Sequence, residues 1–80
     1  MNSKIKFLEL MLSDTVSHRD TLEMELNRLL NEESLPIIHK KIDFDKTLGD
    51  IVLTNNKIKA LSDYMVGTDQ INDVDNNNND

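Results

Sequence analysis

The sequence predicts an all-α protein built on an antiparallel helical hairpin, and three observations support that fold class. Apolar residues recur at helical spacing over two long segments, residues 3–31 and about 35–66. The first segment contains neither glycine nor proline. Between the two segments, residues 32–36 end in Pro36, which breaks a helix interior but suits a first turn. Two long helices joined by so short a turn pack antiparallel.

The first segment follows a heptad pattern with a polar interruption. Six of its eight seam positions are apolar, the a and d positions being Ile5, Leu12, Arg19 and Leu26 with Leu8, Thr15, Leu22 and Leu29. Residues 13–21, the polar waist, contain Val16 as their single apolar residue. The pattern fits one continuous helix or a helix broken near 13–17, and the unbroken interior favours the continuous form.

The second segment has a stronger apolar repeat. Ser34 is the expected N-cap, and Leu48 and Leu61 broaden the apolar stripe. Its five a positions are all apolar: Ile37, Phe44, Ile51, Ile58 and Met65. Gly49 marks the place where a kink is expected, and Gly67 is the expected helix stop. We therefore predict a hairpin domain over 1–66 and a disordered, acidic, Asn/Asp-rich tail over 67–80.

The two helices carry more apolar surface than they can bury against each other. A turn at Ser34 sets residues 26–29 opposite 38–42 and the polar waist opposite residues 47–55. That second stretch includes an apolar belt of Leu48, Ile51, Val52 and Leu53. The N-terminal turns are apolar around more of their circumference than one seam needs. We therefore expect association into a four-helix-bundle-like homo-oligomer, with a dimer favoured. The alternative is a monomeric three-helix domain in which a broken first segment covers the belt.

Composition excludes several classes of function. The 80-residue chain has no cysteine, which removes thiol chemistry and cysteine-ligated metals, and its net charge of −6 is concentrated in the tail. Scattered bases make nucleic-acid binding unfavourable. His18 with Asp14, and His39 with Asp43, each give only two metal ligands. We expect no enzyme activity, cofactor or metal, no membrane segment, and a cytoplasmic location.

The sequence therefore predicts a small interaction protein that inhibits or bridges a partner protein through apolar helix surface. The expected partner-binding residues are Phe7, Leu10, Met11, Val52 and Leu53. Arg19, a charge at a seam position, is expected to specify the oligomer. Ten asparagines suit an AT-rich phage or mobile element, whose small proteins often inhibit host machinery in the host cytoplasm.

Two other functions stay open at this point. One is a structural or assembly component of a phage particle. The other is an oligomer that sequesters a small anion such as a nucleotide between subunits, using Arg19, Arg28, Lys40 or Lys41.

Overall fold

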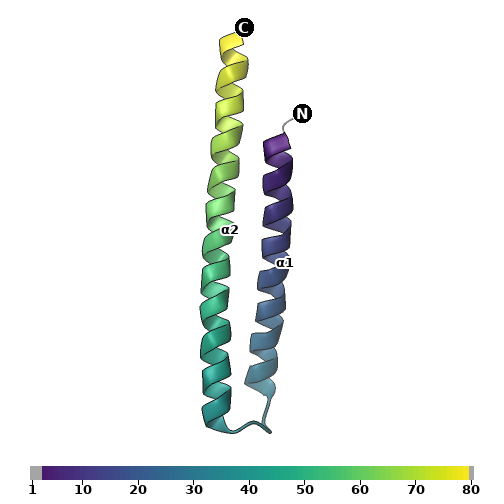
Figure 1. Cartoon of the computed structure of the whole chain (residues 1–80), viewed down its shortest axis with the longest axis vertical. Helices are drawn as coiled ribbons and strands as arrows, with labels where there is room; N and C mark the ends of the chain where they lie inside the picture. The colour runs from purple at the N-terminus through teal and green to yellow at the C-terminus, as the bar shows by residue number, and fades with distance from the viewer. Residues whose placement is uncertain (1–2, 80) are drawn as a thin grey trace.

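Two long helices lie side by side and antiparallel in the computed structural model, which describes residues 3–79, and the side chains of residues 3–68. Helix α1 is Ser3–Asn31 and helix α2 is Ile37–Asn79. The rod measures 66 × 16 × 13 Å, and α2 continues beyond the start of α1 (Figure 1). The predicted all-α hairpin is confirmed.

Helix α1 runs unbroken through the polar waist. The hydroxyl Oγ1 of Thr15 donates to the carbonyl of Met11 at 2.7 Å, and Oγ1 of Thr21 donates to the carbonyl of Ser17 at 3.1 Å. These hydroxyls bond to carbonyls one turn earlier, so they do not compete with the helix as caps would. The continuous form is confirmed, and the broken first helix of the three-helix alternative is absent from the structure.

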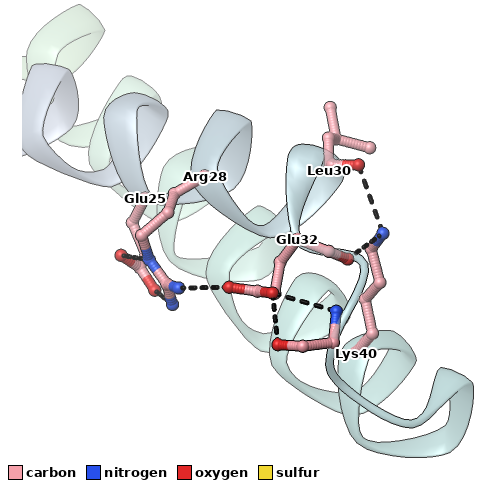
Figure 2. A network of polar contacts seen from close by, with 6 residues as sticks. Glu25, Arg28, Leu30, Glu32 and Lys40 are labelled. Atoms are coloured by element: carbon pink, nitrogen blue, oxygen red, sulfur yellow. Dashed lines mark hydrogen bonds and ion pairs between the residues drawn. The ribbon is translucent and has the colours of Figure 1, made fainter.

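The connection between the helices is held by polar contacts (Figure 2). The backbone N–H and the hydroxyl of Ser34 both donate to Oε1 of Glu32, at 3.0 and 2.5 Å. These bonds hold the pKa of the Glu32 carboxyl below its usual range. The sequence predicted that Ser34 caps α2, and that prediction is wrong. Ser34 instead closes the turn through its bonds to Glu32. The cap position falls to Pro36, whose carbonyl accepts from the backbone N–H of Lys40 at 3.0 Å.

Lys40 ties the start of α2 to the end of α1. Its ammonium Nζ donates to the carbonyls of Leu30, at 3.2 Å, and Glu32, at 2.8 Å. These carbonyls lie at the C-terminus of α1, where helical acceptors have no partner inside the helix and the dipole favours a cation. The contact also sets how α2 is rotated about its own axis, because Lys40 must face α1.

The predicted seam of α1 is confirmed at every position. All eight a and d residues are buried or half-buried, and Leu29 is the most enclosed, at 1% exposed. On α2, four of the five predicted a residues are also buried or half-buried: Phe44, Ile51, Ile58 and Met65. Ile37 is 83% exposed, because α2 begins there and α1 has already ended.

Threonine, rather than leucine, completes the seam of α2. Thr47 and Thr54 are buried on either side of Ile51, whereas Leu48, expected to broaden the stripe, is exposed. The Thr54 hydroxyl donates to the carbonyl of Asp50 at 2.7 Å. No buried side-chain N or O atom of the described residues lacks a hydrogen-bond partner. The polar waist therefore faces a surface that includes two buried threonines, and three of the four belt residues, Leu48, Val52 and Leu53, are exposed.

Helix α2 passes straight through both glycines. Neither Gly49 nor Gly67 has a positive φ angle, so the expected stop at Gly67 is wrong for this structure. The predicted disordered tail, 67–80, falls mostly on residues whose side chains lie outside the described set. The division of the chain into a hairpin domain and a tail stays a prediction.

Gly67→Ala tests the continuation of the helix. A Cβ at this position meets nothing within 4 Å, so alanine fits the helix without strain. We expect the free energy of unfolding to rise by about 0.5–1 kcal/mol, measured by urea titration of the circular dichroism signal. If Gly67 instead adopted the left-handed conformation of a helix stop, alanine would destabilise the protein. Gly49→Ala, in the middle of α2, is the matched control and is expected to stabilise in either case.

Candidate protein-interaction surface

Half of the large apolar side chains of residues 3–68 lie on the outside of the hairpin. Among the described residues only two apolar side chains are buried, Leu29 and Ile51. Thirteen large ones are exposed: Phe7, Leu10, Met11, Met24, Leu30, Ile37, Ile38, Ile42, Leu48, Val52, Leu53, Tyr64 and Val66. Single exposed apolar residues are ordinary, but clusters of them mark interaction sites.

One cluster of exposed apolar side chains forms a groove beside the turn, here called the turn-end groove. Its volume is about 810 Å³. Apolar side chains supply most of its wall, with three charged residues among them: Leu30, Ile37, Ile38, Ile42, Phe44 and Leu48, with Lys40, Lys41 and Asp45. All but Leu30 belong to α2, so the groove is one flank of the second helix closed off by the last turn of the first.

The sequence had placed Ile38 and Ile42 in the seam, opposite Leu29 and Leu26, and that pairing is wrong. Ile38 is 71% exposed and Ile42 is 61% exposed. The bonds of Lys40 to the end of α1 turn α2 so that Lys40, with Phe44 one turn later, faces the neighbouring helix instead. The isoleucines are thereby rotated onto the flank.

Three of the predicted partner-binding residues cluster near the start of α1. Phe7, Leu10 and Met11, the N-terminal patch, are all exposed, Phe7 at 61%. Phe7 also lines a groove of about 370 Å³ with Ser3, Lys4, Leu8 and Thr68. Spacings of three and four residues place the three side chains on neighbouring parts of one helix surface.

Val52 and Leu53, the other two predicted residues, are exposed but do not share one surface. Leu53 lines a groove of about 360 Å³, here called the polar groove because its other lining residues are polar: Asp14, Thr15, His18, Asp50, Thr54 and Lys57. Val52 follows Leu48 by one helical turn and extends the flank of the turn-end groove. The five predicted residues are therefore spread over separate surfaces.

The polar groove confirms that the waist of α1 lies beside residues 47–55, the register predicted from the turn. It also brings Asp50 close to the predicted Asp14–His18 pair, an approach that sequence spacing could not show. Even so, no group of three or more potential metal ligands occurs in the part of the chain that the structure describes.

Arg19 is satisfied by its own helix. Its guanidinium lies 3.3 Å from Oδ1 of Asp20 and 3.7 Å from Oε1 of Glu23, with the side chain 30% exposed. Within the described side chains, Arg19 forms no ion pair with an acid of α2. The stem occupies the seam while the charge reaches solvent. A role in specifying the oligomer stays a prediction.

Three of the four bases assigned to anion binding already hold acceptors of the same chain. Arg28 makes two bonds to Glu25, at 3.0 and 2.6 Å, and lies 3.9 Å from Glu32 (Figure 2). The bond from Arg28 holds the pKa of the Glu25 carboxyl below its usual range. With Arg19 and Lys40 engaged as described, Lys41 is the one of these four bases that holds no acceptor within the described residues.

Within the described residues, neither helix has a stretch apolar enough to cross a membrane. Comparison with protein-family models, with curated proteins and with solved structures found no match to this chain.

Proposed function

We propose that this protein is a non-enzymatic interaction module that binds a partner protein through apolar helix surface and thereby inhibits or bridges it. The observation that carries the proposal is the imbalance between thirteen exposed and two buried apolar side chains over residues 3–68. A domain of this size gains little stability from its own core, so surface of this kind is favourably covered by another chain.

The N-terminal patch is the proposed partner-binding surface. Phe7, Leu10 and Met11 have the i, i+3 and i+4 spacing by which one helix face inserts into a groove of another protein. The asparagine-rich composition supports an origin in a phage or mobile element. The partner in that setting is a component of host machinery in the cytoplasm.

Affinity capture from a lysate of candidate host cells tests the proposal. The bait is the full chain, and the variant is Phe7→Asp combined with Leu10→Asp, both at exposed positions. A charge buried at the centre of an apolar contact costs several kcal/mol, so we expect the captured partner to be lost. Circular dichroism verifies that the variant stays helical.

Met24→Asp is the matched control, because Met24 lies on the same helix and is 73% exposed. The control is expected to retain the partner that the double variant loses. Equal capture by the wild type, the double variant and the control would show that the N-terminal patch is not the binding surface.

A further inference from the structure

The flank of α2 beside the turn carries a second apolar stripe. It runs from Ile38 through Ile42 and Leu48 to Val52, all exposed, over about 21 Å of helix. Asp45 interrupts it midway between Ile38 and Val52, at the same rotation about the helix axis because the spacing is seven residues. A carboxylate in the centre of an apolar stripe requires a cation when another chain covers that stripe.

Lys41 is the cation in the same groove. It lines the turn-end groove together with Asp45, and both side chains are exposed. Neither takes part in an ion pair within the described side chains, where the pairs are made by Arg19 and Arg28. A lysine four residues before an acid is also the less favourable order for pairing within a helix. Both charges are therefore available to another chain.

The arrangement of these residues is complementary to itself. In an antiparallel pair of α2 helices crossing at residue 43, stripe residues at equal distances on either side of the crossing point lie at the same level. Lys41 then faces the partner's Asp45. Ile38 faces the partner's Leu48. In a twofold interface each of these contacts occurs twice.

The same charges disfavour other registers. A crossing point at Asp45 would bring two carboxylates together, which repel each other in an apolar setting. Asp43, at the preferred crossing point, causes no such conflict, because a spacing of two residues places it on the opposite side of the helix from Lys41 and Asp45.

We infer that a second copy of this chain occupies the turn-end groove, antiparallel and related by a twofold axis near residue 43, with Lys41 of each copy paired to the partner's Asp45. Leu30 closes the groove at the turn. The turn ends of the two hairpins overlap, over residues 37–49 of each α2, and form a four-helix arrangement. This dimer leaves the N-terminal patch uncovered, so it does not depend on the proposed partner binding.

A charge swap, followed by sedimentation equilibrium, tests the inference. The wild type should reach twice the chain mass of 9.2 kDa at high micromolar concentration. Asp45→Lys alone places lysines opposite each other twice, and should weaken the dimer about tenfold or more. The double variant Lys41→Asp with Asp45→Lys restores opposite charges at unchanged net charge. It should regain the wild-type dissociation constant to within about threefold.

The inference would be overturned by a wild type that stays monomeric, or by a double variant whose dimer remains as weak as that of Asp45→Lys. It would also be overturned if Ile42→Asp, which places a charge in the groove, dimerised as strongly as the control Met24→Asp on α1. The substituted positions are exposed, so the variants are expected to fold, and circular dichroism checks this.

Disulfide trapping gives a second readout, because the natural chain has no cysteine. Lys41→Cys protein mixed with Asp45→Cys protein should cross-link on mild oxidation, since the two positions face each other across the dimer. Each variant alone should cross-link far less. Equal cross-linking in all three solutions would contradict the register.

A dimer that forms while lysate capture fails would contradict the proposed function but not this inference.

Discussion

Leu29→Ala is expected to remove about 2–5 kcal/mol from the free energy of unfolding. Leu29 is 1% exposed and lies in the last turns of α1, between the neighbouring helix and the closing turn. Truncation leaves a cavity there, and a hairpin with two buried apolar side chains has little other core with which to fill it.

Urea titration followed by circular dichroism measures this effect, at one fixed protein concentration because association also stabilises the fold. Leu10→Ala is the control, since it makes the same change on the same helix at an exposed position. It should alter the free energy of unfolding by less than about 0.5 kcal/mol. Similar losses for both variants would mean that Leu29 is not the centre of the core.

Lys40→Met is expected to destabilise the hairpin by about 2 kcal/mol. Methionine keeps the apolar stem but loses the ammonium that donates to the carbonyls of Leu30 and Glu32. Both carbonyls then need water as their hydrogen-bond donor, at a turn that the stem of residue 40 partly covers. The loss should also free α2 to rotate about its axis.

Thermal and urea unfolding report the stability change, and amide hydrogen exchange at residues 30–40 reports the local loosening. Lys46→Met is the control, because Lys46 is exposed on the same helix and takes part in none of the described ion pairs. If Lys40→Met matched the control in both measurements, the lysine would not be what holds the turn.

The hairpin could be predicted from the sequence because its signals are local. The spacing of apolar residues and the position of Pro36 depend only on neighbours in the chain. All eight seam positions of α1 follow from the heptad, even Arg19, whose long stem fills the seam while its charge leaves.

The rotation of α2 could not be predicted in the same way. That helix has apolar residues on two sides, and periodicity alone does not say which side faces α1. The choice depends on Lys40 reaching the carbonyls at the end of α1, a contact between residues on different helices. Buried Thr47 and Thr54, at seam spacing from Ile51, were the available sequence signal, but threonine is an unusual seam residue.

Of the two candidate surfaces, one could be predicted from local signals and the other depends on contacts between the helices. The N-terminal patch was predictable because α1 has only one seam, and the apolar residues outside it are exposed, apart from half-buried Val16. The turn-end groove was missed because Ile38 and Ile42 had been assigned to the interior. Whether either surface binds a partner is decided by the experiments proposed above.

The threonine-lined seam has a consequence for the lifetime of the free protein in a cell. Thr47 and Thr54 bury fewer methyl and methylene groups than leucines would, so this seam opens more often than one with leucine at both positions. Proteases cut the opened form in proportion to its population. Occupation of the outer apolar surfaces lowers that population by mass action. Copies without a binding partner should therefore be degraded first, so that the abundance of the protein follows that of whatever it binds.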